Sequence, residues 1–384
     1  DGAVQKRTLC DFRKNDVEAL AEWSAQVLGA LALSGQLPGE DLAVDGTIIR
    51  AASSCGANVK RKHLEKRINR LRNRIREQLS APEETPGGTA RLEQQAARLQ
   101  QALETMNGLG KVKESDAITL TEPEAPAKKL KTTGGFAPAH NIQMVSDTQS
   151  GAIIHVDVVA EANDQGQLAP QCQKAQETLK RAGQIAGLEQ LGHGVRTVSA
   201  DGAYHDTLQL RDLMQQNIQA AVPDGQQNRR VPNVEPGYLA TDFTYDSQTN
   251  TMTCPQGASL VHQGFNDGKT AVRYRGSAAV CNACPAKGQC CPTSKSGRNV
   301  NRPLYSEIVT AVATYTCSPE GEMRMQARRT TAEGNFARIK NALHWPRCRT
   351  WGAAGAKAEA LWRQITHNIL LLIGHWEPLT LKCA

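Results

Sequence analysis

The chain opens with the pattern of an amphipathic helix. Between residues 16 and 35, apolar side chains recur every three or four positions, which is the spacing of one helix face. The stripe consists of Leu20, Trp23, Val27 and Leu31. Pro38 follows closely, so we expect the helix to end near residue 35. Apolar residues from 42 to 49, around an Asp-Gly-Thr segment, then predict a buried strand.

Residues 57–106 have a different pattern, with apolar positions in two near-heptad series. The first series is Leu64, Ile68, Leu71, Ile75 and Leu79, and the second is Leu92, Ala96, Leu99, Leu103 and Met106. This spacing is typical of coiled coils, and residues 82–88 contain helix breakers, so we predict an antiparallel helical hairpin inserted after the first strand. The first arm is strongly basic, because nine lysines and arginines lie between residues 60 and 76.

Strands and helices alternate in the next part of the chain. A linker rich in proline and lysine at 122–135 precedes two strands, 141–145 and 152–159, that fit a hairpin. The elements expected after them are a helix at 170–186, a strand at 195–200, a helix at 207–216 and a strand at 220–222. This order predicts a mixed α/β sheet.

The last part of the chain contains a turn-rich segment followed by a helical segment. Residues 224–321 are rich in turns and carry the clustered cysteines, which indicates a second insertion. Two helical stripes follow, Ala332, Phe336, Ile339 and Leu343, and then Leu361, Ile365, Ile369 and Leu372.

These patterns divide the chain into five parts. We expect an N-terminal helical segment (1–40), a core (41–55 and 136–223), a helical hairpin (56–110), a cysteine-rich insertion (224–321) and a C-terminal helical part of the core (322–384). Because the first residue is Asp1 and not methionine, we expect the N-terminal segment to be truncated.

Composition and charge exclude some classes of protein and favour an anionic partner. Hydrophobic residues make up 40% of the 384 residues and charged residues 22%, which excludes a disordered or collagen-like chain. No apolar run reaches the roughly 20 residues of a membrane helix, so we expect no membrane partner. Lysine and arginine number 45 against 38 acidic residues, which favours an anionic partner. The 11 cysteines and the lack of a secretory signal favour a reducing cytoplasm.

Three carboxylates are candidate catalytic residues, because each lies at the end of a predicted element. They are Asp45, Asp201 and Glu333. Each has a structural alternative, since Asp-Gly is a common turn pair and the Thr330–Glu333 stretch fits a helix capping box. A salt bridge from Glu333 to Arg329 is equally ordinary.

Taken together, the three carboxylates fit a two-metal site for phosphoryl transfer. Mg²⁺ prefers carboxylate and water oxygens, and two ions about 3.5–4 Å apart can activate an attacking oxygen and stabilise a leaving one. The surroundings of Glu333 are basic, with Arg328, Arg329, Arg338, Lys340, Arg347 and Arg349 nearby in sequence. A carboxylate cluster among cationic side chains suits a polyanionic substrate.

Several ordered motifs resemble those of the DDE transposases of bacterial insertion sequences. They are Val44-Asp45-Gly46-Thr47, Asn141-Ile142-Gln143, Asn163-Asp164, Ala200-Asp201-Gly202-Ala203-Tyr204 and the stretch from Ala332-Glu333-Gly334-Asn335 to Lys340. The resemblance covers nearly the whole chain and is strongest to the branch with a coiled-coil insert after the first Asp and a cysteine-rich insert before the Glu. It implies a ribonuclease-H-like fold in which Asp45, Asp201 and Glu333 bind Mg²⁺ or Mn²⁺.

The resemblance further implies a transposase that cleaves DNA strands and transfers them during transposition. We expect Arg329, Arg338 and Lys340 to position phosphates, and Arg67, Arg70 and Arg74 on the basic arm to follow the backbone of double-stranded DNA. A homodimer or higher assembly is expected, because two element ends are joined. The alternatives are a truncated or domesticated DNA-binding relic without catalysis, and a nuclease of the same fold that cleaves without joining.

The clustered cysteines predict a structural zinc site. Cys281 and Cys284 form a CxxC pair, Cys290 follows, and Cys254 precedes them in a Cys-Pro-Gln-Gly turn. Four thiolates bind Zn²⁺ tetrahedrally and can fix a segment with little apolar core. A redox pair and unligated thiols are the alternatives, and Cys291 is a possible substitute for Cys290.

Overall fold

Strand β1 (Asp41–Arg50) is central in the main sheet of the computed structural model, which describes residues 11–12, 16–54, 58–80, 88–108, 110, 113–129, 135–161, 163–224, 238–266 and 270–374. β1 pairs antiparallel with β5 (Phe136–Asp147) and parallel with β7 (Thr197–Ser199). Outside these lie β6 (Ile153–Val159), antiparallel to β5, and β8 (Gln219–Ala221), parallel to β7. The sheet is therefore mixed, as predicted, and its order β6-β5-β1-β7-β8 is consistent with a ribonuclease-H-like fold.

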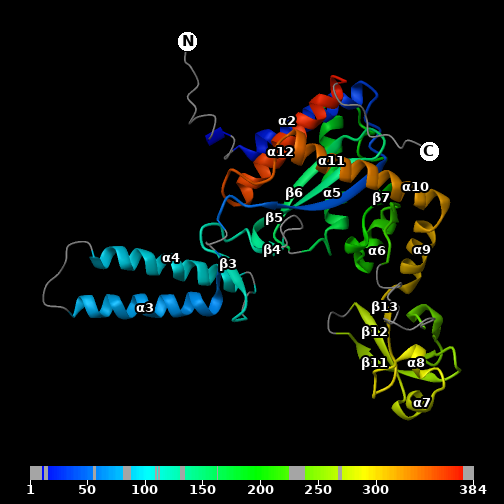
Figure 1. Ribbon diagram of the computed structural model, residues 1–384. Coiled ribbons are helices and arrows are strands. Elements are labelled where there is room, and N and C mark those ends of the chain that lie inside the picture. Colours follow the sequence, from blue (N-terminus) through cyan, green and yellow to red (C-terminus); the bar gives the residue numbers. More distant parts are fainter. Residues whose placement is uncertain are drawn as a thin grey trace.

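Helices cover both faces of this sheet (Figure 1). The cluster that contains Leu42 and Val44 of β1 is closed by α5 (Leu168–Ala186) and α6 (Thr207–Gln215). The opposite cluster, with Ile49, is closed by α12 (Gly352–Leu372) and by Phe336 and Ile339 of the preceding helix. Helix α2 (Val17–Leu33) packs against both α5 and α12. Alternation along the strands thus places apolar residues on both faces, as a sheet covered on two sides requires.

One long helical stretch runs from residue 319 to 342. Its parts are α10 (Pro319–Arg328), the π-helical η4 (Arg329–Glu333), α11 (Gly334–Ala337) and the π-helical η5 (Arg338–Ala342). Ser318 caps its start by accepting the Gly321 N–H at 3.1 Å, and Pro319 occupies the first turn. Glu333 therefore lies inside a helix, so the capping-box alternative is wrong.

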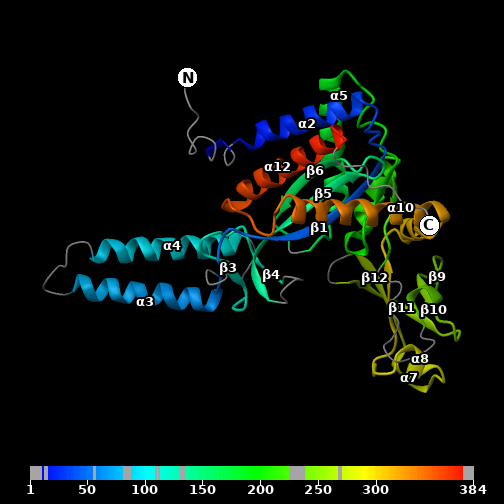
Figure 2. The same cartoon turned by 45° about the horizontal axis from the view of Figure 1, so that its top comes forward.

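Between β1 and β5 the chain forms a helical hairpin that extends away from the main sheet (Figure 2). Its elements are β2 (Asn58–Lys60), α3 (Arg61–Leu79), α4 (Gly88–Gly108) and β3 (Ala117–Thr119). The near-heptad leucines of both arms pack in a cluster of their own, which contains Leu64, Ile68, Leu71, Leu99 and Met106. The hairpin thus carries its own core and does not depend on the main sheet for burial.

Part of the expected linker at 122–135 is built into the core. Strand β4 (Ala127–Lys129) pairs with the start of β5, and the Glu122 side chain is fully buried. Its carboxylate accepts hydrogen bonds from Ser53, from the Gly352 N–H group and from His140 Nε2 at 2.8 Å. With these four donors, the buried Glu122 joins the base of the hairpin to the segment after β1, to β5 and to α12.

The cysteine-rich segment forms an antiparallel five-stranded sheet in the order β13-β12-β11-β10-β9. The sequence predicted only turns there, because these strands are short and mostly polar. The elements are η3 (Ala240–Asp242), β9 (Thr244–Asp246), β10 (Thr251–Thr253), β11 (Ser259–Phe265), β12 (Ala271–Gly276), α7 (Ala278–Ala283), α8 (Lys287–Cys290) and β13 (Asn299–Pro303). The next helix, α9 (Ser306–Thr316), contacts β8 and α6, so it belongs with the core although the sequence boundary fell at 321.

Candidate active site

Asp45 lies in β1, and Asp201 lies just beyond the end of the neighbouring strand β7. In the parallel pairing of β1 and β7, Ala43 is opposite Ser199. Asp45 follows Ala43 by two residues, and Asp201 follows Ser199 by two residues. The charge of Asp201 acts on Asp45. The two strands therefore bring together aspartates that are 156 positions apart in sequence (201 − 45).

The Asp45 carboxylate is largely buried and surrounded by charge. Its Oδ1 accepts the Gly46 N–H at 2.9 Å, and its Oδ2 lies 3.6 Å from Arg328 Nη1. Burial raises the pKa of Asp45 to about 6; Arg328 and the Gly46 N–H group lower it, while Asp201 and Asp164 raise it. Asp45 lies within β1, so the turn alternative is wrong for this Asp-Gly pair.

Asp201 begins the short 3₁₀ turn η2 (Gly202–Tyr204). Its Oδ1 accepts the Ala203 N–H at 2.8 Å, which fixes the carboxylate just beyond the end of β7. For this Asp-Gly pair the turn interpretation and the catalytic interpretation are compatible, because the turn orients the side chain beside Asp45.

The helical stretch 319–342 lies along β1 on the face that carries Asp45. Alternate β1 residues contact it in order, with Asp41 bound by Arg324, Asp45 by Arg328 and Thr47 by Lys340. Glu333 lies between the last two contacts in sequence, on the exposed side of η4. Its carboxylate has no hydrogen bond or ion pair within the described residues, and the structure does not bring it to the two aspartates. Among the described residues, no three His, Cys, Asp or Glu side chains lie close enough together in their present positions to hold a metal ion.

A fourth carboxylate, Asp164, belongs to the same site. Its Oδ1 accepts hydrogen bonds from Gln143 Nε2 at 2.7 Å and from Asn141 Nδ2 at 3.1 Å. Gly46 makes room for it, because a Cβ atom at residue 46 would lie 2.5 Å from the same oxygen. The sequence motifs included Asp164 without giving it a role. The pairing of Gly46 with Gln143 across β1 and β5, which was not visible in the sequence, explains its position.

Tyr204 closes the site from the η2 side. Its hydroxyl donates to Gln143 Oε1 at 2.6 Å, and its ring is buried. Burial raises the pKa of Tyr204, and the nearby charges of Asp164, Asp45 and Asp201 act in the same direction. Tyr204 is therefore a neutral hydrogen-bond donor, and it fixes the glutamine that in turn fixes Asp164.

The three basic residues expected near Glu333 have different surroundings. Lys340 Nζ donates to Thr47 Oγ1, which places its charge two residues from Asp45 along β1. Arg329 is exposed beside Glu333. Arg338 is half-buried, burial lowers its pKa, and its charge acts on His367 of α12. Of these three residues, Lys340 has a contact on β1 next to Asp45.

The arginines expected to contact DNA on the hairpin share one exposed face of α3. Arg67, Arg70 and Arg74 are spaced by three and four residues, so their side chains align along the helix. All three are exposed, while Leu64, Ile68 and Leu71 on the other side face α4. The result is a basic stripe on an arm that extends from the main sheet (Figure 1).

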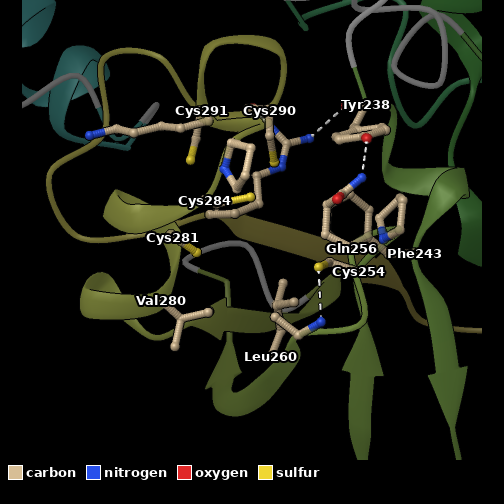
Figure 3. Close-up of a pocket in the computed structure, with 16 residues that line it drawn as sticks. Tyr238, Phe243, Cys254, Gln256, Leu260, Val280, Cys281, Cys284, Cys290 and Cys291 are labelled. Atoms are coloured by element: carbon tan, nitrogen blue, oxygen red, sulfur yellow. Dashed lines mark hydrogen bonds between the residues drawn. The ribbon is translucent and has the colours of Figure 1, made fainter.

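The four cysteines expected to bind zinc line one pocket, together with Cys291 (Figure 3). The pocket has a volume of about 230 Å³ and also contains Arg298 and Lys287. None of the five thiols forms a disulfide bond.

The last third of the chain matches a known protein family. Residues 253–373 match the family described as "Transposase DDE domain", so this part of the chain is similar to the DDE domain of transposases. The match spans 121 of 384 residues (373 − 253 + 1) and includes Glu333 but neither aspartate. No curated protein and no solved structure matches the chain significantly.

Membrane-spanning helices are absent from the part of the chain that the structure describes. No helix there is both long and apolar enough to cross a bilayer.

Proposed function

We propose that this protein is a transposase that cleaves DNA strands at the ends of an insertion sequence and joins them to target DNA. The observation that supports the proposal most is the register of β1 and β7 together with the effect of the Asp201 charge on Asp45. The helical stretch that lies along β1 carries Glu333 on its exposed side, and this stretch lies in the part of the chain that matches the transposase DDE domain.

The donor set at this site fits a hard divalent cation. Asp45 presents carboxylate oxygens from β1 and Asp201 presents them from the end of the adjacent strand β7, while Asp164 adds negative charge held by two amide donors. Mg²⁺ and Mn²⁺ prefer such oxygen ligands. We assign Asp45, Asp201 and Glu333 as the residues that would hold the ions, with Glu333 moving inward from its exposed position. The metal would supply activation of the attacking oxygen and charge stabilisation of the leaving oxygen.

The basic residues would hold the DNA. Lys340, bound to Thr47 two residues from Asp45, would position a phosphate, and we include Arg329 and Arg338 because they lie on the same helical stretch. On α3, Arg67, Arg70 and Arg74 would contact the backbone of double-stranded DNA at a distance from the chemistry, without reading its sequence. Joining two element ends requires two active sites, so we propose a homodimer or higher assembly acting in the cytoplasm.

A strand-transfer assay tests the proposal. The full chain is incubated with an oligonucleotide duplex carrying the flanking element end and with target DNA, with and without Mg²⁺. We expect metal-dependent cleavage and joining by the wild type. Asp201→Asn keeps the side-chain size but removes a charge that would hold the ion, so we expect it to bind DNA normally and to form no product.

The outcomes separate the alternatives. Cleavage without joining would indicate a nuclease. DNA binding with no reaction by the wild type would favour a non-catalytic relic. Cleavage by Asp201→Asn at the wild-type rate in saturating Mg²⁺ would contradict the assignment of the carboxylates as metal ligands.

A further inference from the structure

The pocket in the β9–β13 module is built from three separate stretches of chain. Cys254 follows β10, Cys281 and Cys284 lie at the end of α7, and Cys290 and Cys291 lie at the end of α8. Figure 3 shows the five cysteines around the same cavity. Nothing in the proposed DNA chemistry uses them.

Helices α7 and α8 have almost no apolar attachment to the module. Neither helix contributes a buried residue, and the largest apolar side chain of α7, Val280, is 52% exposed. The buried cluster beneath them consists of Phe243, Met252, Leu260, Tyr274 and Val300, with Cys254 and Cys290 packed against it. A cluster this small gives little free energy for ordering two helices and their connections.

The backbone around the cysteines is shaped to hold sulfur atoms. Cys254 Sγ accepts the Ala258 N–H at 3.2 Å, in a turn closed by Gly257 at a φ of +79°. A Cβ atom on Gly276 would lie 2.8 Å from Cys281 Sγ, so the glycine leaves the space that this sulfur occupies.

Positive charge lies beside the same sulfurs. Arg298 donates to the carbonyl oxygens of Cys290 and Tyr238, at 2.9 and 3.1 Å. Its Nε atom is buried and has no hydrogen-bond partner within the described residues. Lys287 also lines the pocket. These two cations complement the charge of a group of thiolates, and a thiolate would be an acceptor for the orphan N–H group.

We propose that this pocket binds one Zn²⁺ through Cys254, Cys281, Cys284 and Cys290, and that the ion replaces an apolar core beneath α7 and α8. The four thiols release their protons to solvent as four Zn–S bonds form, which leaves a net charge of −2 for Arg298 and Lys287 to balance. Rotation of the cysteine side chains and an inward movement of α7 and α8 bring the sulfurs to the Zn–S distance of about 2.3 Å. Cys290 is chosen over Cys291 because it packs with Cys254 against the same cluster.

Metal analysis of the full chain, purified under reducing conditions and supplied with Zn²⁺, tests the proposal. We expect about one zinc per chain, and Co²⁺ should give the intense visible absorption of tetrahedral thiolate coordination. Serine at any of the four ligand positions should lower the zinc content to near zero. Cys317→Ser, at an exposed cysteine outside the pocket, should keep it. No bound metal in the wild type, or disulfide bonds between these cysteines in the zinc-supplied protein, would overturn the proposal.

Two further comparisons keep the test independent of folding and of DNA chemistry. Gly276→Ala should weaken Co²⁺ binding because its methyl group meets Cys281 Sγ, whereas Gly288→Ala, with open space around it, should not. Cys290→Ser should lose the metal and Cys291→Ser should retain it; the reverse result would overturn the choice of Cys290. Zinc content is measured without DNA, so this outcome does not depend on strand transfer.

Discussion

At the scale of single residues, the site depends on the space that Gly46 leaves in β1. A Cβ atom there would lie 2.5 Å from Asp164 Oδ1 and 2.7 Å from Gln143 Nε2. We therefore expect Gly46→Ala to displace both side chains and to lower the free energy of unfolding by about 1–3 kcal/mol. It should also reduce strand transfer, since Asp164 and Gln143 border the two aspartates.

The control for this variant is Gly108→Ala. Gly108 ends α4, and a Cβ atom added there would have no neighbour within 4 Å among the described residues, so the substitution should change neither quantity. Urea denaturation and the strand-transfer assay measure the two effects. If Gly46→Ala had the stability and activity of the wild type, the positions of Asp164 and Gln143 would not matter for the site.

The sequence pointed to Asp45 and Asp201 because both follow runs of apolar residues that predict buried strands. It assigned no role to Asp164, because the contacts of that residue depend on the register of β5 against β1. It also could not reveal that Arg328 lies against Asp45, since this ion pair depends on how the helix crosses the sheet. Pairing between distant segments is not encoded in local periodicity.

At the scale of elements, α12 is attached to β6 through buried polar groups. His367 is fully buried, and its Nε2 lies 3.0 Å from the Gly151 carbonyl oxygen, which fits donation from the neutral ring. Burial lowers the pKa of His367 to about 4, and Arg338 adds to this effect while the bond to Gly151 opposes it. The folded protein therefore resists protonation of this ring.

This predicts a loss of stability in mild acid. Below about pH 6.5 the unfolded chain takes up the proton and the folded chain does not, so the free energy of unfolding falls until the folded-state pKa is reached near 4. Above pH 6.5 the residue makes no such contribution. When the pH falls from 6.5 to 4, the free energy of unfolding of His367→Gln should therefore decrease by about 3 kcal/mol less than that of the wild type. Urea denaturation at each pH measures this difference. If the free energy of unfolding had the same pH dependence in the two proteins, His367 would not be the residue responsible.

The α3 arm makes a separate prediction about DNA affinity. Replacing Arg67, Arg70 and Arg74 together by glutamine should weaken binding to all DNA sequences. It should also reduce the salt dependence of log Kd by up to about 3, because up to three phosphate contacts are lost. Fluorescence anisotropy across a salt series measures both quantities.

A matched control removes three positive charges elsewhere. Lys180, Arg181 and Arg196 are exposed on the α5 side of the molecule. Their replacement by glutamine should alter the salt dependence much less. Equal effects of the two triple variants would mean that net charge, and not the α3 stripe, governs binding.

Among the elements, the hairpin was the most predictable and the β module the least. The leucines of α3 and α4 follow a long, regular repeat that packing then satisfies. Strands β9 and β10 have three residues each, too few to show alternation. The anchoring of Glu122 was also hidden, because four distant donors make its burial favourable.

At the scale of the whole molecule, Figure 1 shows the main sheet with its helices, the helical hairpin and the β9–β13 module as three parts. Each part has an apolar cluster of its own. The main sheet holds the carboxylates, the hairpin carries the basic stripe, and the β module carries the cysteine pocket. Because these clusters are separate, damage to the stripe or the pocket should leave the arrangement of Asp45 and Asp201 intact. Chemistry, DNA binding and metal-dependent folding can thus be tested one at a time.

The central claim is that Asp201 acts by holding a divalent ion, and metal rescue tests it most directly. Cysteine at position 201 replaces a hard oxygen ligand by sulfur, which Mn²⁺ accepts better than Mg²⁺ does. We predict that Asp201→Cys forms no strand-transfer product in Mg²⁺ and regains part of the wild-type rate in Mn²⁺, while Asp201→Ala stays inactive in both. Wild-type activity of Asp201→Cys in Mg²⁺, or equal activity of the two variants in Mn²⁺, would contradict the account.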